Sequence, residues 1–351
     1  MARRCFVAIP VVGWATVKKV LPLIACFIIG VSGLTACYVY ARLNTPGRPL
    51  AAPARIFISP GSTLQQTAQM LVAEGILASV QPFRFWAQLT GKDRSIQSGE
   101  YILETSLTPR RLLETLTQGQ VIHHMVTIPE GLTLKHIAKR LEARGFGPQE
   151  QFLSLSTSPQ FLAKWDLQEH GLEGYLYPDT YFFSKQSSAA DILGRMVTRL
   201  SEVFTPAMQQ QAQELGFSQH EVLTLASLVE KETGAAEERP LIAGVFHNRL
   251  RQNIPLQCDP TVIYGIPNFD GNLTRRHLRT PTPYNTYLFT GLPPGPIANP
   301  GLAAIQAVLA PAETNYLYFV ARGDGTHVFS TRLADHNRAV RRFQKRGSRN
   351  G

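Results

Sequence analysis

The sequence predicts an α+β protein: a single N-terminal transmembrane helix, then a small α+β subdomain, then a larger mixed α/β domain. Residues 20–41 contain no charged side chain, and a strand–turn–helix pattern occurs twice with an offset of 70 residues. A long helical stripe then precedes a segment rich in Gly, Pro and Tyr. At about 150 residues per domain, a chain of 351 residues has room for two folded units and an appendage.

The first element is the apolar run VLPLIACFIIGVSGLTACYVYA at residues 20–41. With a rise of about 1.5 Å per residue, this run matches the roughly 30 Å hydrocarbon core of a bilayer. Lys18 and Lys19 precede it, and Arg3 and Arg4 lie upstream. This positive charge predicts a cytoplasmic N-terminus on the inner membrane and places the remaining chain in the periplasm.

Two other interpretations of the run remain open at this point. A cleaved signal peptide has an apolar core of about 7–15 residues, which is shorter than this run. Residues 34–37 resemble a lipoprotein processing site with Cys37 as the lipid acceptor, but the apolar run continues through residues 38–40. We therefore favour an uncleaved anchor.

Charge is concentrated at the two ends of the chain. The formal net charge is +10, of which residues 1–41 carry +4 and residues 338–351 carry +6, so residues 42–337 are neutral. A groove that follows phosphates needs its excess of Lys and Arg within the folded body. The sequence therefore predicts no nucleic-acid partner. It predicts a basic C-terminal tail that is disordered, with a patch for anionic lipid or polymer as the alternative.

The cysteines predict neither a disulfide framework nor a metal site. Cys5, Cys26 and Cys37 lie in the first 41 residues, which leaves Cys258 alone in the body. The histidines do not have H-E-x-x-H spacing. We expect no metal and no cofactor.

The internal repeat links residues 61–75 and 131–145. The two segments share Gly, Thr, Leu, Ala, Leu, Ala and Gly at matching positions, and each follows a short β-type run. Leu64, Ala68 and Leu71 form one helical stripe, and the closing Gly suits a left-handed cap. The pattern resembles a LysM-like module, which binds N-acetylglucosamine polymers, and a plain spacer is the alternative.

These features predict the organisation of the whole chain. The expected segments are a cytoplasmic N-terminus at 1–19, a transmembrane helix at 20–41, a Pro- and Ala-rich linker at 42–54, a LysM-like domain at 55–150, a second domain at 151–337 and a basic tail at 338–351.

An aromatic segment, Glu-Gly-Tyr-Leu-Tyr-Pro-Asp-Thr-Tyr-Phe-Phe, occupies residues 173–183. Pro178 biases Tyr177 away from helix, so we expect an extended chain with Tyr rings on one side. Such rings either stack on sugars or pack in a core, and the pattern does not choose between the two.

A helix with two candidate acids begins at Ser218, where Ser218-Gln-His-Glu221 forms a capping box. Apolar residues then recur with helical spacing. Glu230 and Glu232 lie near the end of the helix, about 160° apart on a helical wheel. Burial would raise the pKa of either carboxyl and make it a proton donor near neutral pH, but periodicity does not choose between them.

The segment after this helix is rich in Gly, Pro, Asn, Tyr and Asp and too long for a plain connector, so it predicts a shaped cleft wall. Five motifs in this order resemble the endolytic murein transglycosylases of the YceG-like family. They are Ala226-Ser-Leu-Val-Glu-Lys-Glu-Thr233, Phe246-His-Asn-Arg-Leu250, Leu256-Gln-Cys-Asp-Pro-Thr-Val-Ile-Tyr-Gly265, Tyr284-Asn-Thr-Tyr287 and Gly291-Leu-Pro-Pro-Gly-Pro-Ile297.

The resemblance implies that the catalytic acid is the second Glu of the Glu-Lys-Glu-Thr motif, which is Glu232. It implies peptidoglycan glycan strands as substrate, cut as they are newly made near the membrane, with peptidoglycan synthases as partners. Cys258 stands where the family usually has a small polar residue, often Thr. The proposed substrate-binding residues are Gln257, Asp259, Tyr264, Tyr284, Asn285 and Tyr287. For the last four a turn or core role is the alternative, and Asp259 is expected to orient Gln257 or a substrate hydroxyl.

Three functions stay open from the sequence. A lytic transglycosylase would use Glu232 alone and leave 1,6-anhydromuramoyl ends. A hydrolytic muramidase would use Asp259 as a second carboxylate and leave reducing ends. A non-catalytic scaffold would bind the cell wall through the LysM-like part without cutting it.

Overall fold

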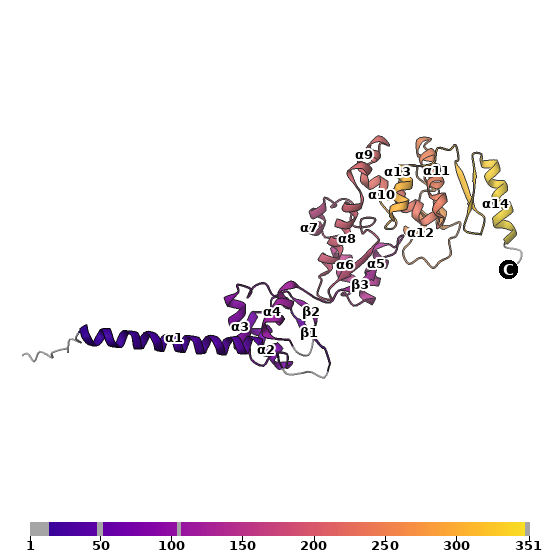
Figure 1. The fold of residues 1–351 in the computed structure, drawn as a ribbon. Helices are drawn as coiled ribbons and strands as arrows, with labels where there is room; N and C mark the ends of the chain where they lie inside the picture. The colour runs from indigo at the N-terminus through magenta and orange to yellow at the C-terminus, as the bar shows by residue number, and fades with distance from the viewer. Residues whose placement is uncertain (1–13, 48–51, 104–106, 348–351) are drawn as a thin grey trace, which may run out of the picture. The chain divides into compact units, whose positions relative to one another are not determined.

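The computed structural model describes residues 14–47, 52–103 and 107–347 (Figure 1). It divides the chain into two compact units, Met1–Ile122 and His123–Gly351. The division falls after Ile122, whereas the sequence suggested a boundary after residue 150. The second copy of the repeat therefore belongs to the second unit.

The first unit is a long helix followed by a small α+β body. Its elements are α1 (Trp14–Asn44), β1 (Ala54–Ile58), α2 (Leu64–Ala73), α3 (Val80–Leu89), β2 (Gly99–Leu103) and α4 (Pro109–Gln118). β1 and β2 pair antiparallel, with Ile56 opposite Tyr101. The inward side chains of both strands share one core with Phe83 of α3 and Leu112 of α4.

The α1 helix continues through Asn44, into the range expected to be linker. Within the described residues, its segment Cys26–Asn44 has the length and apolar composition needed to cross a membrane. Large apolar side chains of this segment are exposed, including Phe27 and Leu34.

The second unit contains two small antiparallel sheets and most of the helices. Its strands are β3 (His124–Thr127), β4 (Thr180–Phe183), β5 (Tyr318–Ala321) and β6 (His327–Ser330). Its α-helices are α5 (Leu134–Ala143), α6 (Gln149–Leu155), α7 (Pro159–Leu162), α8 (Ala189–Val203), α9 (Pro206–Glu214), α10 (Gln219–Glu232), α11 (Arg239–Arg251), α12 (Asp259–Tyr264), α13 (Leu302–Leu309) and α14 (Leu333–Gly347). Short 3₁₀ turns lie at η1 (Ala163–Trp165), η2 (Ala236–Glu238) and η3 (His277–Arg279).

The internal repeat is confirmed as a repeated local structure. Thr63 and Thr133 cap α2 and α5 through their side chains, and Gly61 and Gly131 adopt φ of 77° and 73° in the preceding turns. In each unit a strand precedes the repeat helix, and a later strand pairs antiparallel with it. Two helices, α2 and α3, lie between β1 and β2, whereas α5, α6, α7 and η1 lie between β3 and β4. The repeat therefore builds two separate small sheets, and the LysM-like interpretation stays a prediction.

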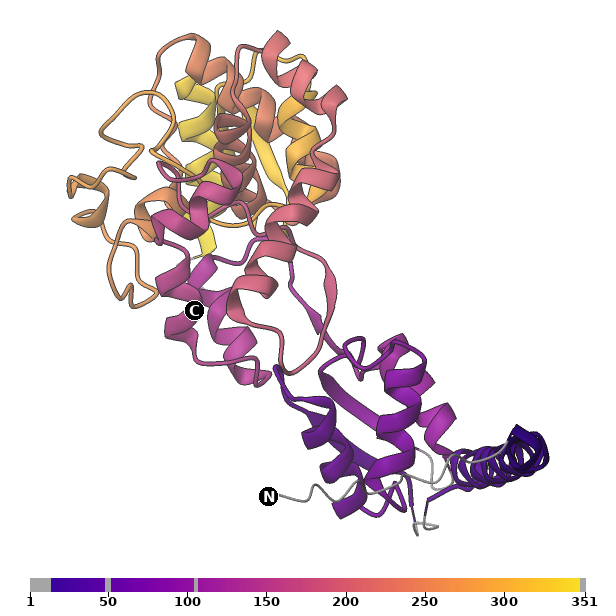
Figure 2. The same ribbon diagram turned by 90° about the vertical axis from the view of Figure 1, so that its left-hand side faces the viewer.

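The α10 helix forms the centre of the second unit. Its residues from Val222 to Val229 are all buried, because α11, α12 and α13 pack against it (Figures 1 and 2). The capping box predicted at Ser218 is present, with the Ser218 side chain accepting from the Glu221 N–H at 3.2 Å. This burial fixes the end of the helix, and with it Glu232.

The expectation of a disordered basic tail is wrong for residues 338–347, which belong to α14. Ala339 and Val340 lie on the buried side of this helix, which packs on β5 and β6. Arg338, Arg341 and Arg342 lie on its exposed side. The charges of Arg338, Arg341 and Arg342 therefore belong to the outer face of a packed helix, and residues 348–351 lie outside the described part of the chain.

Candidate active site

A cavity of about 410 Å³ opens at the C-terminal end of α10. Its walls come from α10, α11, the turn before α12 and the start of that helix, the loop that contains Tyr287, the β5–β6 hairpin and α14. The lining residues are Glu232, Arg249, Leu256, Gln257, Asp259, Tyr287, Tyr318, Phe319, Val320, Ala321, His327, Leu333, His336, Val340 and Gln344. Four of the seven predicted site residues therefore line one cavity.

Glu232 is the last residue of α10, and burial raises the pKa of its carboxyl to about 7. A hydrogen bond from the Cys258 thiol lowers this pKa, the charge of Asp259 raises it, and the charge of His327 lowers it. A carboxyl with a pKa near 7 is partly protonated at neutral pH, so it can both donate and accept a proton.

Glu230, the alternative acid, contacts groups outside this cavity. Its carboxylate accepts a hydrogen bond from the Gly301 N–H at 3.1 Å and lies 4.0 Å from the Arg239 guanidinium. It does not line the cavity that contains Glu232. The structure thus separates two carboxyls that the helical wheel could not.

A tight turn places the residues next to Glu232. Gln257 has a left-handed backbone with φ of 51°, and its N–H donates to the Thr286 carbonyl at 3.0 Å. The Cys258 N–H donates to the Thr286 hydroxyl, also at 3.0 Å. Thr286 of the Tyr284-Asn-Thr-Tyr287 motif therefore fixes this turn through two hydrogen bonds. Asp259 follows the turn as the first residue of α12 and lines the cavity.

Tyr287 and Asp259 form a short hydrogen bond inside the cavity. The Tyr287 hydroxyl donates to Asp259 Oδ1 at 2.6 Å. Burial and the Asp259 carboxylate both raise the pKa of Tyr287, so the phenol keeps its proton and remains a donor. This bond holds the Asp259 carboxylate in place beside Glu232.

Arg249 is a cavity residue that the sequence reasoning missed. It is buried, and its guanidinium donates to the Leu317 carbonyl at 2.6 Å, the Pro255 carbonyl at 2.8 Å and Gln257 Oε1 at 3.1 Å. The side chain therefore joins the residue before β5 to the turn at residues 255–257. Its place in the Phe246-His-Asn-Arg-Leu250 motif was the available signal.

His327 was also missed. Glu238 holds it by accepting from the His327 backbone N–H at 2.8 Å and by contacting Nδ1 at 2.6 Å. This pair is buried and places an imidazole on the cavity wall near Glu232. Sequence spacing gives no signal for it, because 89 residues separate the two partners.

Three predicted site residues lie away from this cavity. Asn285 is 1% exposed, and its amide donates to backbone carbonyls, among them that of Thr280 at 2.8 Å. Tyr264 donates to Glu173 at 3.2 Å, and the ring of Tyr284 packs edge-on against Tyr264 with centroids 4.8 Å apart. In this structure these three side chains contact other protein groups and help to hold the chain around residues 264–285 in place. This is the turn or core role that the sequence left open for them.

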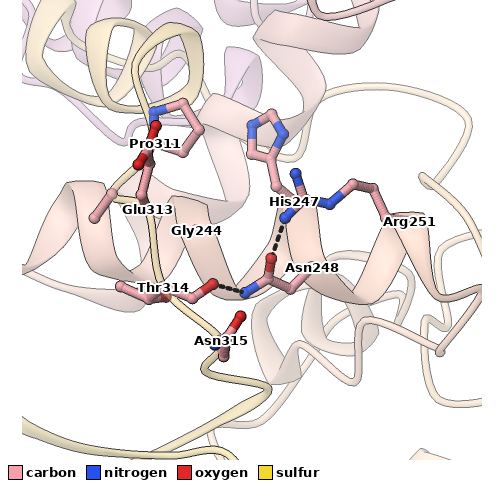
Figure 3. A pocket seen from close by; sticks show the side chains of 9 residues that line it. Gly244, His247, Asn248, Arg251, Pro311, Glu313, Thr314 and Asn315 are labelled. Atoms are coloured by element: carbon pink, nitrogen blue, oxygen red, sulfur yellow. Dashed lines mark hydrogen bonds between the residues drawn. The ribbon is translucent and has the colours of Figure 1, made fainter.

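A second cavity, of about 390 Å³, lies where α11 meets residues 311–315 (Figure 3). There the Asn248 amide donates to the Thr314 carbonyl at 2.8 Å, and Arg251 donates to Asn248 Oδ1. None of the predicted site residues lines it. Asn248 therefore links α11 to the segment that leads to β5 through this hydrogen bond.

Comparison with known proteins shows the family of the chain. The profile of the YceG-like family matches residues 56–342. The chain belongs to the YceG-like family. The match ends at Arg342 within α14, so it includes the first part of the helix that lines the cavity.

Relatives of this YceG-like chain extend over most of its length. The endolytic murein transglycosylase of Bacillus subtilis strain 168 is 30% identical over 82% of this chain and 84% of the relative. The enzyme of that name from Streptococcus pneumoniae D39 is 30% identical over 81% of this chain and 57% of the relative. The crystal structure of a YceG-like protein from Listeria monocytogenes has a TM-score of 0.58 and 30% identity, covering 82% of this chain and 99% of that one.

A second carboxyl of this YceG-like chain, Glu173, also has a raised pKa of about 7, chiefly because it is buried. Its oxygens accept from the Leu134 N–H at 2.9 Å, the Asn299 amide at 3.0 Å and the Tyr264 hydroxyl at 3.2 Å. Protein groups thus surround this carboxyl, and it does not line the Glu232 cavity.

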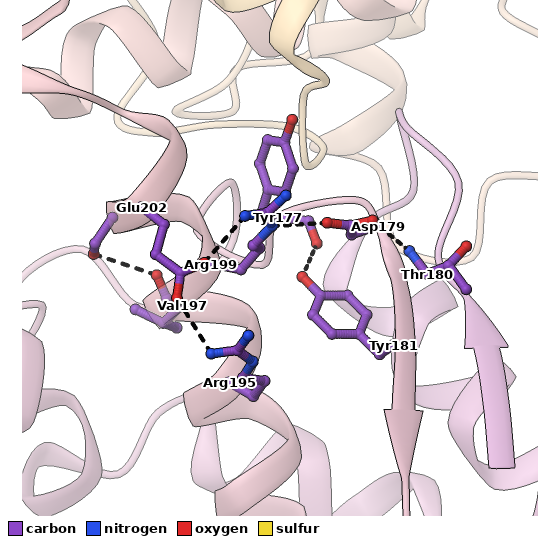
Figure 4. A network of polar contacts seen from close by, with 9 residues as sticks. Tyr177, Asp179, Thr180, Tyr181, Arg195, Val197, Arg199 and Glu202 are labelled. Atoms are coloured by element: carbon purple, nitrogen blue, oxygen red, sulfur yellow. Dashed lines mark hydrogen bonds and ion pairs between the residues drawn. The ribbon is translucent and has the colours of Figure 1, made fainter. Parts of the chain in front are cut away.

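The aromatic segment that contains Glu173 packs in the core. Tyr175, Tyr177 and Tyr181 are each less than 10% exposed, and Tyr181 donates to the Tyr177 carbonyl at 2.6 Å. Within the same segment, Asp179 accepts a hydrogen bond from Arg199 Nε at 2.7 Å, a contact drawn in Figure 4. Of the two interpretations of this segment, the structure supports core packing rather than a sugar-stacking face.

Proposed function

We propose that this chain is an endolytic murein transglycosylase, a lyase that cuts MurNAc–GlcNAc bonds within peptidoglycan strands and leaves 1,6-anhydroMurNAc ends. The observation that carries the proposal is a single carboxyl, Glu232, on a cavity wall with a pKa raised to about 7. Relatives with this name match more than four-fifths of the chain, which supports it.

Glu232 would act first as acid and then as base. Its protonated carboxyl gives its proton to the glycosidic oxygen as the bond from MurNAc C1 to that oxygen breaks, which releases the GlcNAc 4-hydroxyl. The resulting carboxylate takes the proton of the MurNAc 6-hydroxyl, and O6 bonds to C1. The proton taken from the 6-hydroxyl replaces the one given to the glycosidic oxygen, so Glu232 ends the reaction protonated. No water is consumed.

Asp259, Tyr287 and Gln257 are the proposed substrate contacts on the same wall. A negative Asp259 keeps the pKa of Glu232 high and stabilises positive charge on the sugar ring as the bond breaks. The Tyr287 hydroxyl and the Arg249 guanidinium hold Asp259 and Gln257 respectively, so both side chains are ordered before substrate binds.

We propose that α1 anchors the chain in the cell inner membrane, with the N-terminus in the cytoplasm and the chain that follows α1 in the periplasm. The apolar segment Cys26–Asn44 and the preceding Lys18 and Lys19 support this topology. An anchored enzyme would meet glycan strands close to their site of synthesis, which makes peptidoglycan synthases candidate partners.

Hydrolysis is the second candidate function, because Asp259 shares the cavity with Glu232 and could activate water. The test is mass spectrometry of the products that the purified chain releases from uncrosslinked glycan strands. Anhydro ends are the expected result. Reducing ends alone would show a muramidase, and strand binding without new ends would show a scaffold.

A further inference from the structure

An apolar groove lies between α1 and α3 in the first unit. This cavity, of about 520 Å³, is lined by Val31, Ser32, Thr35, Ala36, Val39, Tyr40, Leu43, Phe85, Trp86 and Leu89. None of these residues carries a charge. Together they form a continuous apolar surface that begins on one helix and continues on the other.

The two faces of α3 differ from those of a helix that only covers a core. Phe83 and Ala87 are fully buried against the core of the unit. On the outer side, Phe85 is 49% exposed and Leu89 is 64% exposed. Soluble proteins rarely leave a contiguous patch of large apolar side chains in water, so this face requires a partner.

The level of the groove along α1 indicates which partner it is. The groove residues of α1 run from Val31 to Leu43, which is about 18 Å of helix at 1.5 Å per residue. Most of this stretch belongs to the charge-free run at 20–41, in the half that follows its midpoint. The side chains of α3 that face the groove therefore lie beside the part of α1 nearest the outer leaflet.

Aromatic and basic side chains border the same region. Tyr38 and Tyr40 of α1 are more than 60% exposed. The Arg42 guanidinium lies 5.3 Å from the Tyr38 ring, and that of Arg110 lies 5.9 Å from the Trp86 ring. Trp and Tyr beside Arg are typical of the boundary between lipid acyl chains and headgroups.

We propose that the outer face of α3 embeds in the outer leaflet of the membrane that α1 spans, with lipid acyl chains filling the groove. The occupant follows from continuity, because the groove extends the lipid-facing surface of α1. The α+β body that follows α1 then rests on the bilayer at a fixed depth, as interfacial helices do. This inference rests on the proposed anchor and goes beyond it.

The test uses the full chain in phospholipid vesicles whose acyl chains carry bromine, a quencher of tryptophan fluorescence. The three native tryptophans are replaced by Phe, and one reporter is introduced by Phe85→Trp, Leu34→Trp or Phe57→Trp. Phe57 is the matched control, since it is 48% exposed but lies on β1, whereas α3 and α4 are the helices that pack on α1.

We expect blue-shifted emission and quenching for the Phe85→Trp and Leu34→Trp proteins, and neither for the Phe57→Trp protein. Quenching at Leu34→Trp without quenching at Phe85→Trp would overturn the inference and leave the anchor intact. Absence of quenching at both would overturn the anchor as well. Equal quenching at Phe57→Trp would contradict a specific role for α3.

A second measurement avoids any change in α3. Trp86 is kept as the sole tryptophan through Trp14→Phe and Trp165→Phe. Trp86 lines the groove, so the same quenching is expected, and emission unaffected by brominated chains would overturn the inference. Circular dichroism of each variant verifies that the first unit is folded.

Discussion

Glu232 and Glu173 are two carboxyls of one unit whose pKa values burial raises to about 7. Their surroundings differ. Leu134, Asn299 and Tyr264 hydrogen-bond to Glu173 and occupy its oxygens. Glu232 has the Cys258 thiol as a hydrogen-bond donor and lies on the wall of a cavity of about 410 Å³.

The comparison shows that a raised pKa alone does not identify a catalytic acid. Burial disfavours the charged form of any carboxyl, whether the site is structural or functional. Of these two carboxyls with a pKa near 7, Glu232 lines a cavity in which a sugar oxygen could reach it, and Glu173 does not. Glu173 instead links the start of α5 to the loop before α13, which is a structural task.

The largest expected effect separates the two carboxyls by activity. Glu232→Gln removes the only proposed proton carrier, so we expect the rate of glycan cleavage to fall by about 10²–10⁴-fold. Glu173→Gln should keep a near wild-type rate in molecules that remain folded. The measurement is the initial rate of new strand ends, with thermal unfolding as the folding check. Comparable losses of activity in both folded variants would contradict the distinction.

Stability against pH should show the cost of keeping Glu232 charged. Its folded pKa of about 7 lies above the ordinary value of 4.5, so the folded state binds more protons than the unfolded state between these values. Stability is therefore highest at the acid end of this window and is lost as pH rises through 7, by up to about 3 kcal/mol from this group.

Glu232→Gln should remove that part of the pH dependence. Chemical denaturation of the full chain in detergent at about pH 5 and pH 8 measures it, and the difference between the two pH values should shrink in the variant. An unchanged difference would mean that Glu232 is charged at little cost, contrary to its burial.

Two tyrosine variants extend the comparison to the partners of each carboxyl. Tyr287→Phe removes the 2.6 Å hydrogen bond to Asp259 inside the cavity, so we expect about a tenfold loss of cleavage rate, as for one hydrogen bond to a charged group. Tyr264→Phe removes the 3.2 Å bond to Glu173 and should lower stability but not the rate. Steady-state kinetics with a melting curve for each protein distinguishes the two, and the reverse pattern would refute the assignment.

Substitution of Cys258 should shift the pH profile of cleavage by less than about one unit. The thiol is a weak donor to Glu232, so the stronger hydroxyl donor in Cys258→Thr should lower the pKa on the profile. Cys258→Ala removes the donor and should raise the pKa on the profile. Shifts in the same direction for both variants would show that packing, rather than the hydrogen bond, sets the pKa of Glu232.

The smallest effect is expected at the neighbouring acid. Glu230→Gln changes a group bound to the Gly301 N–H and outside the cavity, so cleavage should continue at nearly the wild-type rate. A loss of activity as large as that of Glu232→Gln would reverse the choice between the two carboxyls.

Local sequence signals predicted the parts of this fold that depend on local interactions. The capping box at Ser218 and the Gly-x-Thr start of each repeat are encoded within a few residues, and the structure contains them. The cavity is assembled from segments more than 100 residues apart in the sequence, from Glu232 to Gln344, so residue spacing alone could not reveal Arg249 or His327. Motif resemblance supplied Glu232, Gln257, Asp259 and Tyr287, all of which line it.

The failures have physical reasons as well. The Arg residues at 338–342 suggested a solvated tail, but Ala339 and Val340 provide an apolar stripe that packs on the β5–β6 hairpin. Asn285 has the chemistry of a sugar-binding amide, yet it satisfies buried carbonyls of its own loop. A side chain suited to ligand binding is equally suited to holding a long loop together.

The most direct test of the central claim is cleavage of glycan strands in water enriched with ¹⁸O, followed by mass spectrometry of the new muramoyl ends. If Glu232 alone shuttles the proton while O6 attacks C1, the ends are anhydro sugars without the heavy isotope. Reducing ends that carry ¹⁸O would show that water is the nucleophile, and the single-carboxyl account would be wrong.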